Sequence, residues 1–215
     1  MRWYLVLGLW VLAACSRPLT PLEERFAQDI FGETLDTSVI RVSRGFGLTP
    51  PPTKMPEEVH VFGVNPEACL RIPRPASDRP PPQAFALWNR MHFGGELYSG
   101  EMAAPWPYAL RFPNAMILAH ELTHVWQWQN RKMTGYTPLR AATESWTAGD
   151  PYFWEAGERP AFLSFGYEQQ ASIVEDYLCF TFANSDHPQR EELRVLLEPL
   201  FPVVNLDLPV PAPTQ

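Results

Sequence analysis

The sequence lacks a basic run, an internal repeat and a cysteine-rich motif. Its 215 residues carry a formal net charge of −7 at pH 7, and an acidic chain without a basic cluster argues against a nucleic-acid partner. The absence of a repeat excludes a solenoid or a propeller. Only three cysteines are present. Cys69 and Cys179 stand alone in the sequence, without the spacing of a zinc-cysteine site.

Apolar residues and proline are abundant. Hydrophobic side chains make up 46% of the chain, enough for one good core, and a single domain is the simplest expectation. The 24 prolines cluster at 50–56, 73–82 and 199–213, which marks extended or turning connections. We therefore expect a folded domain over 16–200 and a proline-rich tail over 201–215.

Residues 1–15 have the pattern of a targeting segment. Arg2 precedes an apolar run over 3–12 that is too short to span a bilayer as a helix. The small residues before Cys15 resemble the bacterial lipobox, which implies cleavage before Cys15 and a lipid anchor on its sulfur. Ser16 follows in place of aspartate, as in lipoproteins sent to the outer membrane. The lipid anchor places the mature protein in the cell envelope. The alternative is a plain secretory signal, and by either interpretation the mature protein leaves the cytoplasm.

Export changes the expectation for the other two cysteines. The periplasm is oxidising, so Cys69 and Cys179 can form one disulfide. Two residues carry little pattern, and a pair of free buried cysteines fits the sequence equally well.

The most informative segment is 114–129, which reads as a helix and contains the motif H-E-x-x-H. We expect Asn114 to cap its start and Gly135 to stop it. Residues four apart share a helix face, so His120 and His124 can bind one Zn²⁺ ion. Glu121 is then placed to take a proton from water during attack on an amide carbonyl and to pass it to the leaving amine.

Other elements are predicted from periodicity and capping. Thr20, Pro21 and Glu23 open a first helix that Gly32 ends. Further predictions are strands over 39–42, 59–62 and 70–72, a hairpin over 84–88 and 90–93, a connection over 109–112, a helix over 167–184 and a last helix over 191–200.

These segments resemble a known family. Residues 22–45, 84–93 and above all 118–127 are similar to the zincin domain found with bacterial extracellular contractile injection systems, a metallopeptidase of the gluzincin kind. The resemblance covers the first two-thirds of the mature chain, and 49–82 departs from it as an insertion. It implies an α+β fold in which a small sheet packs on the H-E-x-x-H helix and a second helix supplies a ligand.

The resemblance also implies the third zinc ligand. Residues 168–172 are similar to the gluzincin pattern E-x-x-A-D, by which Glu168 binds the metal. Ser172 stands near the position where the family has an aspartate that orients a histidine ligand. Either Ser172 serves weakly or Glu175 or Asp176 takes that role, and Glu175 is also a rival ligand because it lies on nearly the same helix face.

The sequence does not single out one residue that would donate a hydrogen bond to the oxyanion in the transition state. Tyr98, Tyr136 and Tyr167 are candidates, although tyrosines more often pack in the core. We expect His60 and His92 to be structural strand residues and His187 to cap the last helix.

The predicted activity is zinc-dependent hydrolysis of peptide bonds in the bacterial cell envelope. The alternative is a non-catalytic envelope lipoprotein that keeps the fold as a structural or binding module.

Overall fold

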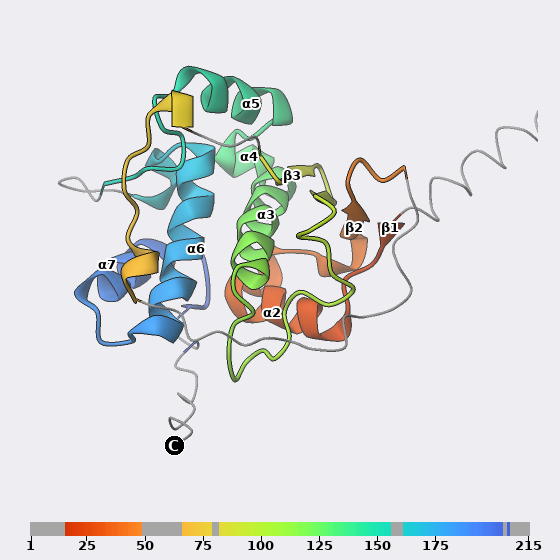
Figure 1. Ribbon diagram of the computed structural model, residues 1–215, viewed down its shortest axis with the longest axis horizontal. Coiled ribbons are helices and arrows are strands. Elements are labelled where there is room, and N and C mark those ends of the chain that lie inside the picture. The colour runs from red at the N-terminus through yellow and green to blue at the C-terminus, as the bar shows by residue number, and fades with distance from the viewer. Residues whose placement is uncertain (1–15, 49–65, 79–81, 156–160, 204–205, 207–215) are drawn as a thin grey trace, which may run out of the picture.

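The computed structural model describes residues 16–48, 66–78, 82–155, 161–203 and 206. Within them the fold is α+β, with a small four-stranded sheet and six helices (Figure 1). The strands are β1 (Ser16–Arg17), β2 (Arg41–Arg44), β3 (Ala84–Leu87) and β4 (Arg90–Phe93). The helices are α2 (Pro21–Phe31), α3 (Asn114–Gln129), α4 (Arg131–Thr134), α5 (Pro138–Thr147), α6 (Tyr167–Ala183) and α7 (Pro188–Leu197).

Helix α2 forms as the sequence predicts. Thr20 accepts a hydrogen bond from the backbone N–H of Glu23, and the Glu23 carboxylate accepts one from the N–H of Thr20, which completes a capping box. Gly32 ends the helix with a φ of +59°, a conformation that suits glycine. The helix buries Phe26 and Ile30 in the core.

The sheet has the strand order β1-β2-β4-β3, with β2 and β4 parallel and the other pairs antiparallel. The hairpin of β3 and β4 is confirmed, and its turn places Trp88 at a φ of 55°. Because β3 pairs only with β4, half of its backbone N–H and C=O groups point away from the described sheet.

Helix α3 lies between the sheet and α6 (Figure 1). It is buried over most of its length, and Trp126 is the largest fully buried side chain. The prediction of a small sheet on this helix, with a second long helix beside it, agrees with these contacts. The core therefore holds α3 rigidly on both sides.

Two strand predictions were displaced or wrong. The strand expected at 39–42 begins at Arg41, because Thr37–Val39 forms a 3-10 turn capped by the Asp36 carboxylate. Residues 70–72 form no strand. Leu70 and Ile72 are exposed while Arg71 between them turns inward, so the apolar alternation is not a buried strand face.

The helix boundaries also needed correction. Asn114 is the first helical residue of α3 and not its cap, and its side chain donates to the carbonyl of Leu97. The helical path breaks at Asn130, and Gly135 ends α4 in the left-handed conformation. Helix α7 begins at Pro188 rather than 191 and ends at Leu197, and His187 caps it as predicted.

The core continues past residue 200. Phe201, Val203 and Leu206 are buried, so the predicted boundary of the tail cuts into packed structure. Within the described residues, none of the helices is both long and apolar enough to cross a bilayer. The predicted strand at 59–62, His60, Cys15 and the targeting segment lie outside the described residues.

Candidate metal centre

The two motif histidines and Glu168 converge at one point. His120 and His124 lie on one face of α3, and Glu168 projects from the first turn of α6. The Nε2 atoms of His120 and His124 lie 3.1 and 3.2 Å from the same oxygen, Oε2 of Glu168. The three residues offer one ligand atom each, all within 4.8 Å of one another.

This spacing suits a zinc ion. Ligand atoms about 2.1 Å from a tetrahedral zinc are about 3.4 Å apart, close to the separations between Glu168 and the two histidines. Two imidazoles and one carboxylate also match the ligand chemistry of catalytic zinc sites, which keep a fourth position open. The side chains present therefore fit a zinc ion.

Nδ1 of each histidine, the ring nitrogen that does not face Glu168, lies beside a side-chain oxygen that can accept a hydrogen bond. Nδ1 of His124 lies 2.8 Å from Oε1 of Gln127, and Nδ1 of His120 lies 3.3 Å from Oε2 of Glu175. The amide of Gln127 cannot be turned around, since its Nε2 donates to the carbonyl of Tyr167 and to Gln170. Both rings thus donate from Nδ1 and direct Nε2 toward Glu168.

The cluster binds protons strongly. Burial alone would lower the pKa of His120, but hydrogen bonds and charges from Glu168 and Glu175 raise it to about 10. Burial would raise the pKa of Glu168, yet the two histidines hold it well below its usual range. A metal ion bound by these groups must displace the protons, so binding will compete with acid.

Glu121 is a buried carboxylate with one oxygen that lacks a partner among the described residues. The residue is 3% exposed, and its Oε2 makes no hydrogen bond within the described part of the chain. Burial raises the pKa of Glu121 to about 7, while the charges of His120 and His124 act to lower it. A buried polar atom without a partner is costly, and a water molecule beside a metal ion would supply one.

Helix α5 holds Glu168 from the other side. Ser145 donates to Oε1 of Glu168 at 3.1 Å, which leaves Oε2 for the histidines. The carboxylate of Glu144 accepts a hydrogen bond from the backbone N–H of Glu168 at the start of α6. A Cβ atom at Gly166 would collide with that carboxylate, so glycine permits this close approach.

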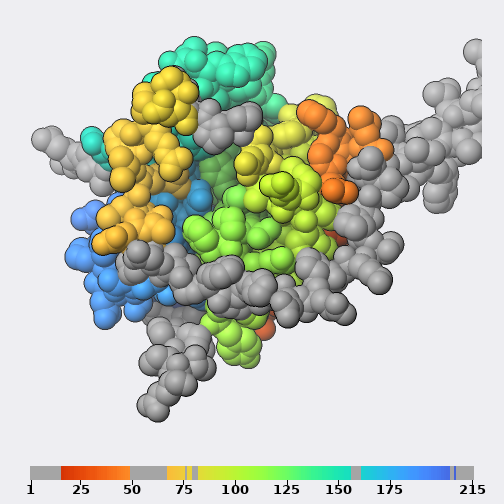
Figure 2. All heavy atoms as spheres, viewed as in Figure 1, coloured from red at the N-terminus to blue at the C-terminus, as the bar shows by residue number. Residues whose placement is uncertain are grey.

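The cluster opens into a cleft of about 520 Å³. In Figure 2, α5 lies along the top of this face, with the 66–78 segment on one side and the β3–β4 hairpin on the other. The cleft is lined by β3, α5, Tyr136, Tyr152 and the motif residues, with Trp146 exposed at α5. Apart from the cluster itself, the described lining residues carry no charge.

Comparisons with known proteins do not identify a relative. No family model, no curated protein and no solved structure matches this chain. The family resemblance drawn from the H-E-x-x-H motif therefore stays a prediction.

Ser172, Glu175 and Asp176, the residues predicted to orient a histidine ligand or to replace Glu168, have different contacts in the structure. Glu175 contacts Nδ1 of His120 and not the convergent Nε2 atoms, so it orients a histidine and is not placed as a ligand. The hydroxyl of Ser172 is buried without a hydrogen bond to the described residues, and Asp176 bonds Arg71 and Trp154. Of these three residues, only Glu175 contacts a candidate ligand histidine.

Among the tyrosine candidates only Tyr136 lines the cleft. Its ring lies 6.0 Å from that of His124, and burial together with nearby carboxylates raises the pKa of its hydroxyl, so it stays protonated. Tyr167 donates instead to the carbonyl of Thr134, and Tyr98 accepts from Arg17 far from the cluster. His92 is structural as expected, with Nδ1 on the carbonyl of Gly45 and its ring stacked on Phe85.

Four residues that support the candidate ligands were not predicted from the sequence. Gln127 lies three residues after His124, a spacing that places the two on one helix face and was available as a signal. Ser145 and Glu144 belong to α5, which was not predicted although Thr137 and Pro138 open it as a cap and first-turn proline. The fourth, Arg71, is 104 residues from its partner Glu175 and has no local signal.

Proposed function

We propose that this protein is a zinc-dependent peptidase with a zincin-like fold. The observation that carries the proposal is the convergence of His120, His124 and Glu168 beside Glu121, a buried carboxylate whose Oε2 has no hydrogen bond within the described residues. A purely structural site has no need for a buried carboxylate next to three ligand groups.

The chain's own residues divide the task. His120, His124 and Glu168 would hold the ion, which when bound polarises the substrate carbonyl and lowers the pKa of water. Glu121, buried next to the candidate ligands, accepts the proton of the attacking water and returns it to the leaving amine. Tyr136, protonated at the cleft wall, donates a hydrogen bond to the developing oxyanion.

The cleft supports a peptide as the substrate. An extended chain can add through backbone hydrogen bonds to the edge of β3 that is unpaired within the described sheet and that lines the cleft beside the cluster. Side chains alternating along that peptide would meet the uncharged wall of α5. The proposed substrate is therefore an extended segment of a polypeptide.

The test is cleavage of a peptide library by the full chain, compared with the variant Glu121→Gln and the control Glu101→Gln. The control changes another buried glutamate, whose carboxylate accepts hydrogen bonds from Thr20 and Ala103 and which does not line the cleft. We expect both variants to retain zinc, and only Glu121→Gln to lose activity, by about 10²–10⁴-fold. Stoichiometric zinc in a wild-type protein that cleaves nothing would instead support a binding module.

We further propose that the protein is anchored by lipid at Cys15 in the outer membrane, facing the periplasm. The Cys69–Cys179 disulfide supports an oxidising compartment. Strand β1 begins at Ser16, so an anchor at Cys15 would join the sheet without a linker. Metabolic labelling with a radioactive fatty acid tests this, and a Cys15→Ser variant that keeps its label would exclude it.

A further inference from the structure

A short surface segment carries Arg71, which is linked to the candidate metal centre through Glu175. The segment, residues 66–78, begins with the 3-10 turn Pro66–Cys69 and runs along α6 toward α5 (Figure 1). We call it the strap. Leu70 is 47% and Ile72 76% exposed, whereas the Arg71 side chain is only 23% exposed. Around Arg71 the strap thus presents two apolar side chains to solvent and turns one charged side chain inward.

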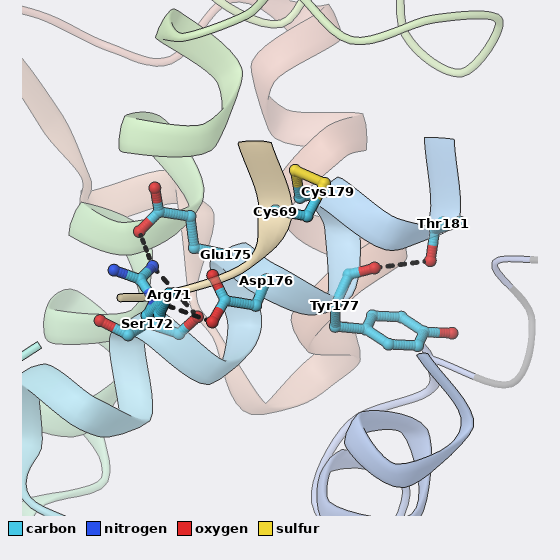
Figure 3. Close-up of a disulfide and its surroundings, with 8 residues drawn as sticks. All are labelled: Cys69, Arg71, Ser172, Glu175, Asp176, Tyr177, Cys179 and Thr181. Atoms are coloured by element: carbon cyan, nitrogen blue, oxygen red, sulfur yellow. Dashed lines mark hydrogen bonds and ion pairs between the residues drawn. A yellow bond between two sulfur atoms is a disulfide. The ribbon is translucent and has the colours of Figure 1, made fainter. Parts of the chain in front are cut away.

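Arg71 bridges two neighbouring carboxylates of α6. Its Nη2 donates to Oε2 of Glu175 at 2.7 Å, and its Nε donates to Oδ2 of Asp176 at 2.8 Å (Figure 3). Trp154 donates to that same oxygen of Asp176. A planar guanidinium can bond two carboxylates at once, which an ammonium group does less well.

The bridge continues to a candidate ligand. The Glu175 oxygen that accepts from Arg71 is the oxygen 3.3 Å from Nδ1 of His120. An unbroken series of contacts therefore runs from Arg71 through Glu175 to the ring whose Nε2 faces Glu168. Without the arginine, Glu175 and Asp176 would be two adjacent, largely buried anions, and repulsion would move Glu175 from the histidine.

The disulfide holds the strap in place. Cys69, two residues before Arg71, is bonded to Cys179, one helical turn beyond Glu175 on α6 (Figure 3). Farther along, the backbone N–H of Arg74 donates to the carboxylate of Asp150. The strap is thus attached to the domain on both sides of Arg71.

We propose that Arg71 is a positioning residue for the metal centre, and that the Cys69–Cys179 disulfide sets its position. Arg71 touches neither the ligand atoms nor the described cleft at the cluster. It acts by holding Glu175 against Nδ1 of His120, which keeps the ring oriented. This inference rests on the proposed zinc site and assigns a role to the strap in that site.

The test is the zinc dissociation constant of the full chain, measured by competition with a chromophoric chelator. The variants are Arg71→Met and Arg71→Lys, and the control is Arg17→Met, which breaks another partly buried arginine–glutamate pair, with Glu23. We expect Arg71→Met to weaken zinc binding by about 10–100-fold. The zinc affinity of Arg71→Lys should lie between those of Arg71→Met and wild type, and Arg17→Met should bind zinc like wild type. The visible spectrum of the cobalt-substituted protein should change in the Arg71 variants alone.

The disulfide is tested by a mutant cycle. The variant Cys69→Ser, Cys179→Ser should weaken zinc binding, and adding Arg71→Met to it should cost less than Arg71→Met costs in wild type. If Arg71→Met weakens zinc binding by the same factor with and without the disulfide, the two changes are independent, and the role given to the disulfide is overturned.

Failure of this inference is distinct from failure of the proposed function. Wild-type protein that binds no zinc contradicts the zinc site itself. If wild-type protein binds stoichiometric zinc and both Arg71 variants bind zinc with the wild-type affinity, only the role of Arg71 is overturned. If Arg71→Met does not fold, Arg71→Lys decides, because it retains the positive charge but not the bridging geometry.

Discussion

The imidazole of His124 and the amide of Gln127 meet within one turn of α3, with Nδ1 2.8 Å from Oε1. Gln127 is fully buried, and its Nε2 is fixed by Tyr167 and Gln170 on α6. The packing of α3 on α6 therefore selects the tautomer of a candidate ligand.

Loss of this contact should weaken metal binding. We expect Gln127→Leu to raise the zinc dissociation constant by about 10–100-fold, because the ring of His124 loses its orienting acceptor. The control is Gln129→Leu on the same helix, where the glutamine bonds Asp36 and Asn89 and contacts no candidate ligand. Equal zinc affinity in the two variants, measured by chelator competition, would contradict the role of Gln127.

The buried carboxyl of Glu121 should make stability depend on pH. Burial raises its pKa to about 7 in the folded chain, compared with an ordinary value of 4.5. The folded chain then holds the proton more tightly than the unfolded chain, so this group's contribution to stability declines as pH rises from 4.5 to 7.

The comparison of wild type with Glu121→Gln isolates this effect. Urea unfolding in the presence of a chelator should show that the glutamine variant gains roughly 2 kcal/mol relative to wild type between pH 5 and pH 8. Any constant cost of burying the amide cancels in this difference. Parallel stability curves for the two proteins would show that the Glu121 carboxyl is not perturbed.

Tyr136 should affect turnover more than substrate binding. This residue lines the cleft beside the cluster, so Tyr136→Phe should lower kcat by about 10²-fold with little change in KM. Tyr167→Phe is the matched control, since that hydroxyl donates to the carbonyl of Thr134 and the ring packs on Tyr136. A similar kcat in both variants would remove Tyr136 from the mechanism.

Local signals account for the parts of the fold that were predicted. The capping box at Thr20 and Glu23 and the proline after Thr20 define α2 within a few residues of sequence. The H-E-x-x-H spacing places His120 and His124 on one face of α3 without tertiary information. Glu168 came from the family resemblance, and the convergence of the three side chains is a finding of the structure.

The parts that were not predicted depend on distant contacts. The alternation of Leu70 and Ile72 with Arg71 predicts a strand over 70–72, yet the two carboxylates of α6 turn the arginine inward and no strand forms. The sequence left the pairing of Cys69 with Cys179 open, because 110 residues separate them. Asparagine is a common helix-capping residue, but the side chain of Asn114 instead donates a hydrogen bond to the carbonyl of Leu97 in a preceding loop.

The proposed function depends on the binding of one zinc ion by His120, His124 and Glu168. The most direct measurement is the metal content of the full chain purified without chelator, with X-ray absorption at the zinc edge, beside Glu168→Gln. We predict one zinc per chain with nitrogen and oxygen ligands at about 2.0–2.2 Å, and an affinity at least about 10²-fold weaker in the variant. Folded wild-type protein that neither contains nor takes up zinc, or a variant that binds it equally well, would contradict the account.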